Sequence, residues 1–244
     1  MSEFLVGTAR RDTSCGDMAR VYELERDGGL FLKIAAPGAL HDEAIMTAYF
    51  HQKGHGAEVL DYRSATYDYL VTRKIAGLSG TECALFGEPR RFAQVYAEGL
   101  RAIHEIQAGD CPKQHVTRAF LESALIRRGA GQAEGWLLPF AGFASVEEAG
   151  QTLDSLAGEL REDCLLHGDY CLPNVILEGE RLNGVIDVGS GGTGDRHFDL
   201  FWALWSMQYN FKTNQWSELF LDVYGRDAFS AERLRLAGAI NVFM

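Results

Sequence analysis

One stretch of this 244-residue chain limits its possible folds more than any other: residues 165–199, LLHGDYCLPNVILEGERLNGVIDVGSGGTGDRHFD. It holds a His-Gly-Asp triplet that ends at Asp169, an asparagine five residues later, and a second aspartate after an apolar run. The apolar segments at residues 174–177 and 184–186 flank Glu-Gly-Glu, a pattern that predicts a β-hairpin. Such a hairpin would place Asn174 and Asp187 at the same end of two paired strands, next to Asp169.

These side chains suggest a particular chemistry. Two carboxylates and a carboxamide supply the oxygen ligands that Mg²⁺ takes together with substrate phosphates. One carboxylate would remain to accept a proton from a hydroxyl nucleophile. His-Gly-Asp alone is a short string, and Asp-Gly pairs commonly serve only as turns. The ordered set that continues to Asp195 and Asp199 favours the functional interpretation.

The segments HGDYCLPN and VIDVGSGGTGDRHFD resemble the aminoglycoside 3′-phosphotransferase family, small-molecule kinases with a protein-kinase-like fold. The resemblance implies that Asp169 is the catalytic base and that Asn174 and Asp187 are Mg²⁺ ligands. It implies that Asp199 is a buried acid that braces the catalytic loop. The alternative for Asp199 is an ordinary acid at a helix N-terminus.

An apolar strand before residue 77 carries a lysine. Lys33 lies late in the segment LFLKI, and a helical pattern at residues 43–52 opens with Glu43. An inward-facing lysine needs a partner, and a strand lysine paired with a helix glutamate is how kinases hold the α- and β-phosphates of ATP. The alternative is an edge-strand lysine that faces water. The family resemblance supports the pairing.

Other positions are assigned to the nucleotide by the resemblance alone. Phe31 corresponds to an aromatic residue that stacks on adenine, although a core phenylalanine is the competing interpretation. Arg73 and Ile75 correspond to the hinge whose backbone binds adenine. The small polar loop at residues 13–18 could offer N–H groups to phosphate, but Asp17 would repel phosphates where the family has a hydroxyl residue.

The pattern changes at Gly77, which we take as a domain boundary. Residues 1–77 alternate as strands with one helix, whereas residues 78–244 are mainly helical. Helices are predicted at residues 89–106, 117–128, 146–160, 200–207, 210–224 and 231–244. The predicted class is α+β and two-lobed: a small antiparallel-sheet N-lobe that binds nucleotide, and a larger helical C-lobe with the catalytic loop, metal site and substrate pocket. His104, near the end of its helix, is predicted to be a buried structural histidine.

Composition excludes several classes of protein. No apolar run of membrane-spanning length and no secretory signal is present. A net charge of −11 disfavours nucleic acid as a partner, and residues 78–244 carry −9 of it. An acidic C-terminal part could steer a cationic substrate or simply confer solubility. Five cysteines at irregular spacing indicate free thiols and a cytoplasmic location.

The substrate-facing positions depart from the family pattern. Ser190 stands where the family commonly has arginine, and Trp205, Tyr209 and Asn210 stand where it has arginine and acidic residues. The chain ends at Met244, whose terminal carboxylate could still serve as a ligand anion. Aromatic rings also bind cations, so an amine substrate remains compatible with these differences.

The predicted function is transfer of the γ-phosphate of ATP, with Mg²⁺, to a hydroxyl of a small and cationic molecule. The first candidate is the 3′-hydroxyl of an aminoglycoside, which would confer antibiotic resistance. Two alternatives are a kinase of another hydroxyl metabolite, such as an amino alcohol or sugar, and a non-catalytic nucleotide-binding module. The expected state is a monomer or dimer without membrane or nucleic-acid partners.

Overall fold

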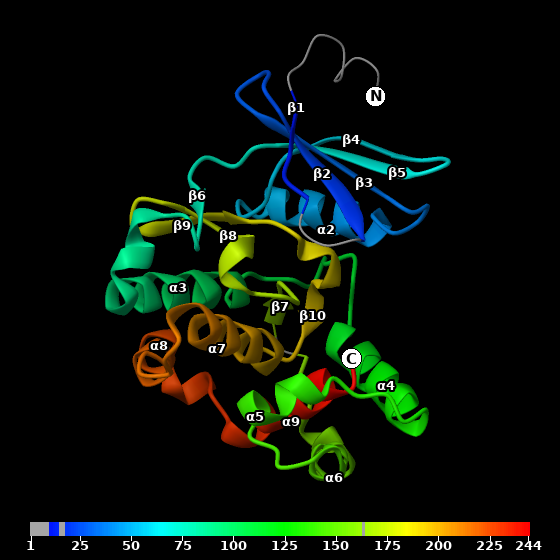
Figure 1. Ribbon diagram of the computed structural model, residues 1–244, viewed down its shortest axis with the longest axis vertical. Helices are drawn as coiled ribbons and strands as arrows, with labels where there is room; N and C mark the ends of the chain where they lie inside the picture. Colours follow the sequence, from blue (N-terminus) through cyan, green and yellow to red (C-terminus); the bar gives the residue numbers. More distant parts are fainter. Residues whose placement is uncertain (1–9, 15–17, 163) are drawn as a thin grey trace.

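The computed structural model describes residues 10–14, 18–162 and 164–244. Its N-terminal strands are β1 (Arg10–Asp12), β2 (Ala19–Leu24), β3 (Leu30–Ala35), β4 (Val59–Ser64) and β5 (Asp68–Arg73). They form one antiparallel sheet with the order β1-β2-β3-β5-β4, at the top of Figure 1. The central residues of the predicted phosphate loop, including Asp17, lie outside the described residues.

The two faces of this sheet have different partners. Helix α2 (His41–Gln52) packs on one face, where Ala44 meets Ala35 and Leu70. A separate apolar cluster of Leu24, Leu30, Leu32 and Val71 covers the other face. Because side chains alternate along a strand, residues 31 and 33 of β3 lie opposite this second cluster. The sheet therefore turns Lys33 toward α2.

Between the large sheet and the helices lies a smaller sheet (Figure 1). The chain leaves β5, and β6 (Leu78–Ser79) then pairs with β8 (Val175–Glu178), which pairs with β9 (Arg181–Val185). Hairpin β8–β9 is the hairpin predicted from the sequence. Strands β7 (Cys164–Leu166) and β10 (Gly192–Gly194) form a further antiparallel pair below it. These two pairs hold most of residues 165–199 in place.

The C-terminal part is mainly helical. Its α-helices are α3 (Pro89–His104), α4 (Val116–Gly129), α5 (Leu138–Ala141), α6 (Val146–Leu156), α7 (His197–Phe211), α8 (Ser217–Tyr224) and α9 (Ala231–Val242). Short 3₁₀ turns are η1 (Ala84–Gly87), η2 (Gly135–Leu137), η3 (Ala157–Glu159), η4 (Leu172–Asn174), η5 (Val188–Ser190) and η6 (Arg226–Ala228). Pro89 begins α3, where a missing N–H costs nothing.

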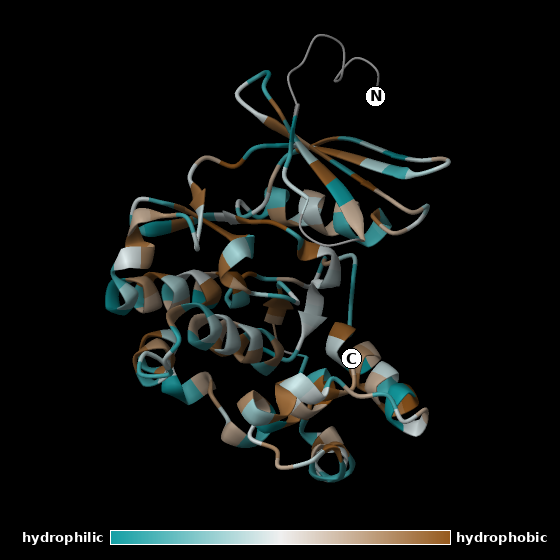
Figure 2. Ribbon diagram, in the orientation of Figure 1, coloured by the Kyte–Doolittle hydropathy of each residue, from teal (hydrophilic) through white to brown (hydrophobic). Residues whose placement is uncertain are grey.

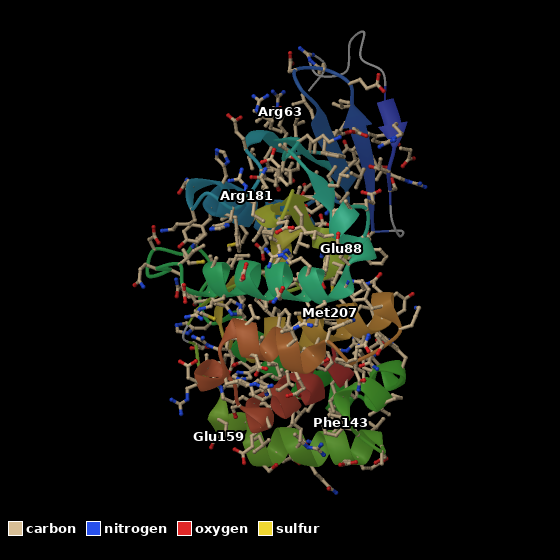
Figure 3. The ribbon with its side chains drawn as sticks, turned by 90° about the vertical axis from the view of Figure 1, so that its left-hand side faces the viewer. Arg63, Glu88, Phe143, Glu159, Arg181 and Met207 are labelled. Carbon is tan, nitrogen blue, oxygen red and sulfur yellow. The ribbon has the colours of Figure 1, made fainter. Side chains whose placement is uncertain are left out.

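Two apolar clusters hold this part together. The first joins α3, α7 and α8 to the two inner strand pairs, and it includes Met207, which Figure 3 labels. The second joins α4, α6 and α9 and includes Phe143, also labelled in Figure 3. Strand β7 reaches both clusters and is strongly hydrophobic in Figure 2. Each fully buried large apolar side chain contributes about 1.5–3 kcal/mol, so β7 is anchored from both sides.

One helix prediction is wrong. Residues 210–224 do not form a single helix, because α7 continues through Phe211 and α8 begins only at Ser217. Lys212 adopts a left-handed conformation with φ of 55°, which ends α7. Residues 213–217 then turn through hydrogen bonds from Gln215 to the Thr213 hydroxyl and from Ser217 to the Asn214 carbonyl. The other predicted long helices are present, with ends shifted by up to four residues.

In the part of the chain that the structure describes, no helix combines the length and apolar character needed to cross a membrane. The four described cysteines, Cys83, Cys111, Cys164 and Cys171, are all buried free thiols.

Candidate active site

A buried carboxylate fixes the His-Gly-Asp turn. Asp199, in the first turn of α7, is fully buried and accepts backbone hydrogen bonds from His167 (2.7 Å) and Gly168 (2.8 Å). His104 of α3 donates from Nε2 to the same carboxylate at 3.1 Å, and its Nδ1 lies 2.6 Å from the Tyr224 hydroxyl. The predicted bracing position of Asp199 and the predicted burial of His104 therefore agree with the structure, and the two form one network.

The turn holds Asp169 by both carboxylate oxygens. Asn174 donates from Nδ2 to Oδ2 of Asp169 (2.9 Å) and to its backbone carbonyl (3.0 Å). The Cys171 thiol donates to Oδ1 at 3.1 Å. Burial raises the pKa of the Asp169 carboxyl above its ordinary value, and these two donors only partly oppose that rise. A carboxylate with a raised pKa is a better proton acceptor than an exposed one.

His167 sets the direction of the turn. Its Nε2 donates to the Ile186 carbonyl at 2.9 Å, so Nδ1 is the acceptor for the Asp169 backbone N–H at 3.2 Å. Gly168 has φ of +86°, and a Cβ there would lie 2.4 Å from the Ser190 carbonyl oxygen. Only glycine fits this position. The turn is thus locked to the strand end that precedes Asp187.

The residue after Asp169 anchors the loop to α3. Tyr170 is fully buried, and its ring stacks on Tyr96 with the centroids 4.7 Å apart. Each tyrosine hydroxyl donates to the other residue's carbonyl, at 2.5 Å from Tyr96 and 3.2 Å from Tyr170. The Leu172 backbone N–H donates to the Ser206 hydroxyl of α7 at 2.9 Å. The loop therefore rests on two helices.

The two distant sequence signals meet in one group of charges. Lys33 of β3 lies 2.7 Å from Glu43 of α2 and 3.0 Å from Oδ1 of Asp187. The predicted lysine–glutamate pair is therefore formed, and the lysine also reaches the end of hairpin β8–β9. Burial lowers the pKa of Lys33, but the neighbouring carboxylates of Asp187 and Glu43 outweigh it and raise the pKa overall. Burial also raises the pKa of Glu43, against the pull of Lys33.

The backbone around Asp187 is unusual. Asp187 has φ of 58°, in the left-handed region that non-glycine residues seldom adopt, and its side chain is half exposed. A Cβ on Gly189 would lie 3.2 Å from the Cβ of Glu43, so this glycine allows η5 to pack closely against α2. The Ile186 backbone N–H donates to the Asn174 carbonyl at 3.0 Å, which joins the two hairpin ends as the sequence predicted.

The structure places the predicted oxygen ligands at one end of the hairpin. Because Nδ2 of Asn174 binds Asp169, its amide oxygen is the atom that remains suited to a cation. Among the described residues, no group of three or more His, Cys, Asp or Glu side chains forms a metal site. Mg²⁺ in proteins is commonly held by one or two such oxygen donors together with substrate phosphates.

The adenine-facing predictions differ in their surroundings. Phe31 is only partly buried and shares the face of β3 that carries Lys33, rather than belonging to an apolar cluster. Ile75 is partly buried against Gly184 of β9. Arg73 is exposed and pairs with Glu58 at 2.7 Å, and its backbone N–H donates to the Glu58 carbonyl. The backbone N–H of Arg73 therefore already has a hydrogen-bond acceptor within the protein.

The substrate-facing predictions have different surroundings. Ser190 is exposed at the end of η5, close to Gly168. Trp205 stacks on the exposed Tyr209, with the ring centroids 5.0 Å apart, and also contacts Trp136 and Trp202. Asn210 donates to the Ser206 carbonyl on its own helix at 2.8 Å. Met244 packs on the second apolar cluster of the C-terminal part.

Sequence reasoning missed three contributors. The Cys171 thiol contacts Asp169, His167 determines the orientation of the turn, and Tyr170 docks the loop on α3. Position in the sequence was the available signal, because all three flank Asp169. The remaining aspartate of the ordered set, Asp195, is structural: it accepts hydrogen bonds from His197, Arg233 and the Arg161 backbone. These bonds outweigh burial and lower its pKa to about 2.

Comparisons with known proteins agree with this arrangement. The family model described as "Phosphotransferase enzyme family" matches residues 16–238. The chain is 36% identical over 233 residues to the probable aminoglycoside 3′-phosphotransferase of Lactococcus lactis subsp. lactis (strain IL1403), covering 95% of this chain and 89% of that protein. It is 33% identical over 222 residues to the aminoglycoside 3′-phosphotransferase of Streptomyces fradiae, covering 84% and 79% of the two chains.

Solved structures are similar across the whole chain. An aminoglycoside-3′-phosphotransferase of type VIII has a TM-score of 0.74 at 26% identity and covers 100% of this chain and 99% of its own. Aminoglycoside phosphotransferase APH(3″)-Id from Streptomyces rimosus, in complex with ADP and streptomycin, has a TM-score of 0.67 at 23% identity, with 95% and 92% covered. The predicted protein-kinase-like fold is confirmed by these matches.

Proposed function

Because this chain belongs to the phosphotransferase enzyme family, we propose that it transfers the γ-phosphoryl group of ATP to a hydroxyl of an aminoglycoside. The observation that carries the proposal is that charged side chains from two distant parts of the sequence lie close together. Lys33 and Glu43 meet Asp187 just after β9, and Asn174, just before β8, holds Asp169. The curated relatives named above support the aminoglycoside as acceptor.

In this proposal the nucleotide lobe comprises residues 1–77, and residues 78–244 form the catalytic lobe. The change of sheet between β5 and β6 supports a boundary at Gly77. Lys33 would contact the α- and β-phosphates and Glu43 would hold the lysine in place. Phe31 would stack on adenine, and the backbone near Arg73 and Ile75 would contact its edge.

Asn174 and Asp187 would hold Mg²⁺ together with phosphate oxygens. A bound Mg²⁺ would neutralise charge on the phosphates during transfer. Lys33 adds a second positive charge next to Asp187, which brings the phosphates and the metal ligands into one region. The protein's own residues thus supply orientation and charge balance, which account for most of catalysis in phosphoryl transfer.

Asp169 would act on the acceptor. Its carboxylate orients the attacking hydroxyl and takes the proton as the oxygen bonds to phosphorus and ADP departs. The buried surroundings that raise the pKa of Asp169 make this proton transfer more favourable. Asn174 and Cys171 keep the carboxylate from rotating.

The proposed acceptor-binding positions carry fewer acidic side chains than a cationic acceptor would call for. Ser190, Trp205, Tyr209, Asn210 and the Met244 carboxylate are the proposed acceptor contacts. The aromatic group around Trp205 would bind ammonium groups of the acceptor through its rings. That same group favours, as a second candidate, a kinase of another amine-bearing alcohol. The complete set of Lys33, Asp169 and Asp187 argues against a non-catalytic module.

The test is an ATP-consumption screen with purified protein. The acceptors are an aminoglycoside with a 3′-hydroxyl, the same compound lacking that hydroxyl, and a panel of amino alcohols and sugars. We expect turnover of the first compound and none of the second. Turnover of a small alcohol with every aminoglycoside inert would favour the second candidate, and no turnover of any acceptor would favour the module. We propose a cytoplasmic location, where ATP and reduced thiols coexist.

A further inference from the structure

The loop between α3 and α4 forms polar contacts with both ends of α2. Asp110 of this loop accepts a hydrogen bond from the Tyr49 hydroxyl (2.8 Å) and pairs with Lys53 (2.9 Å), at the C-terminal end of α2. Lys113 lies 2.7 Å from Asp42, in the first turn of α2. Residues 42 and 53 are about 16 Å apart along a helix axis. The loop therefore contacts α2 at both ends and adds to the buried packing of Met46 and Phe50 in the first apolar cluster of the C-terminal part.

Lys113 makes a second contact that is more telling. Its Nζ donates to the backbone carbonyl of Gly189 at 2.7 Å. Gly189 is two residues beyond Asp187 and packs closely against Glu43. One ammonium group therefore bridges the helix that carries Glu43 and the turn that follows Asp187.

The Lys113 backbone is held independently of its side chain. Its carbonyl accepts hydrogen bonds from the Thr193 backbone N–H of β10 (2.9 Å) and from the Cys111 thiol (3.2 Å). The His115 N–H donates to the Thr193 hydroxyl at 3.0 Å. A Cβ on Gly192 would lie 2.7 Å from the Lys113 carbonyl oxygen, so the two segments touch. The side chain thus extends from a backbone that is already fixed, so only its own rotamers are restricted when it makes these contacts.

We propose that Lys113 is a positioning residue for phosphate binding: its ammonium, shared between Asp42 and the Gly189 carbonyl, sets the spacing at which Lys33 contacts both Glu43 and Asp187. This inference rests on the proposed nucleotide site. Lys33 needs α2 and η5 at fixed distances, because its two carboxylate partners belong to these different elements.

The two contacts of Lys113 differ in strength. Asp42 is 58% exposed, and an ion pair with so much water around it contributes little. The Lys113 side chain is 23% exposed, so its bond to the Gly189 carbonyl is better shielded. A charge-assisted hydrogen bond of this kind is stronger than a neutral one. The carbonyl contact is therefore the stronger of the two, and the Asp42 contact supplies the link to α2.

The experiment measures binding of a non-hydrolysable ATP analogue by calorimetry, with and without Mg²⁺, and hydrogen exchange of the protein without nucleotide. For Lys113→Met we expect the analogue to bind about tenfold more weakly with Mg²⁺. Exchange should become faster in residues 41–52 and 187–194 but not in α6. The KM for the acceptor should stay within about twofold, because the change affects only the phosphate side.

Three further variants separate positioning from general stability. Lys113→Arg keeps donors on a long side chain and should bind the analogue within about threefold of wild type. Asp42→Asn weakens the link to α2 but leaves an acceptor for the ammonium, so its effect on binding should fall between those of wild type and Lys113→Met. Arg91→Met removes a similar exposed contact, with Glu180 at 2.7 Å on the far side of hairpin β8–β9, and should match wild type.

Binding of the analogue by Lys113→Met within twofold of wild type, with unchanged exchange in residues 41–52, would overturn the inference. Loss of binding in Lys113→Arg equal to that in Lys113→Met would overturn it too, because donor chemistry would then be irrelevant. If the wild type fails to bind the analogue, the proposed function is wrong. Hydrogen exchange would still test the link between Lys113 and α2 in that case.

Discussion

The two sides of the loop that carries Asp169 differ in how their polar groups are satisfied. The inner side, toward α3 and α7, satisfies its buried polar groups with several partners: Asp199 accepts three hydrogen bonds, and Tyr170 exchanges two with Tyr96. The outer side, toward the N-terminal sheet, gathers charges that do not fully balance. Burial leaves Asp169 and Glu43 with raised pKa values, and Asp187 stays half exposed.

This difference separates stability from chemistry. A satisfied buried network stabilises the fold and holds one geometry. A carboxylate with a raised pKa lowers the free energy of unfolding at neutral pH, but it accepts a proton more readily. Mutations on the inner side should therefore lower the free energy of unfolding, whereas mutations on the outer side should mainly lower the rate of phosphoryl transfer.

The largest expected effect is on the outer side. Asp169→Asn should lower kcat by roughly 100- to 10,000-fold, the usual contribution of a general base. Its stability should equal or exceed that of the wild type at neutral pH, because the amide NH2 can take the place of Oδ1 and donate to the Cys171 sulfur. The raised pKa means that native protein binds this proton more tightly than unfolded protein, so wild-type stability falls as pH rises above the ordinary value of 3.8.

Steady-state kinetics and urea denaturation at several pH values would check both parts of this prediction. The stability difference between Asp169→Asn and wild type should grow with pH and vanish in acid. Strong destabilisation of Asp169→Asn at neutral pH would contradict the contrast between the two sides.

Lys33→Met should come next. It removes the positive charge that contacts Glu43 and Asp187, so the KM for ATP should rise and kcat/KM should fall by about 10- to 100-fold, the equivalent of one charge-assisted hydrogen bond. The KM for the acceptor should change little. Kinetics with each substrate varied in turn would measure this. An effect on the acceptor alone would place Lys33 outside the nucleotide site.

Asp199→Asn tests the inner side. An amide has only one oxygen, so one of the two backbone N–H groups, of His167 or Gly168, would face an NH2 group. This should lower the free energy of unfolding by about 2–4 kcal/mol. Thermal denaturation should show a lower midpoint, in contrast to Asp169→Asn. Glu122→Gln, an exposed change on α4, serves as the control and should leave the midpoint unchanged. Equal midpoints for Asp199→Asn and wild type would break the comparison.

The smallest effect is expected for Cys171→Ala. Its thiol donates to Asp169 and lowers the pKa of that carboxyl, so removal of the thiol should raise the pKa further. The acid limb of the kcat/KM profile should then shift to higher pH, because the base stays protonated over a wider range. Cys171→Ser keeps a donor and should shift less. A shift toward lower pH in Cys171→Ala would contradict the assigned hydrogen bond.

The sequence predicted the outer side well, because its chemistry depends on residue types at fixed spacing. The predicted hairpin placed Asn174 and Asp187 at the same end of two paired strands. The apolar strand around Lys33 indicated that this lysine needs a carboxylate partner. It did not predict which segments bridge the site. Lys113 reaches Asp42 and Gly189 only because of how two loops fold back, and nothing local in CPKQH indicates those distances.

The same limit explains the missed helix break and the surroundings of the acceptor positions. The apolar pattern continues through residues 211–220, but Lys212 adopts a left-handed conformation that the pattern cannot reveal. Trp205 and Tyr209 share one face of α7 by helical spacing, whereas Ser190 and Met244 depend on tertiary placement. Local periodicity determined the elements, and long-range packing determined which side chains meet.

The most direct test of the central claim, that Asp169 accepts the proton from the acceptor hydroxyl, is the pH–rate profile of phosphoryl transfer for wild type beside Asp169→Asn. The acceptor is an aminoglycoside with a 3′-hydroxyl, at saturating ATP and Mg²⁺. The wild-type rate should fall in acid with a midpoint above the ordinary aspartate range, since burial raises the pKa of Asp169. Asp169→Asn should be slow and lack this limb. A variant that keeps the wild-type rate and the same limb would contradict the claim.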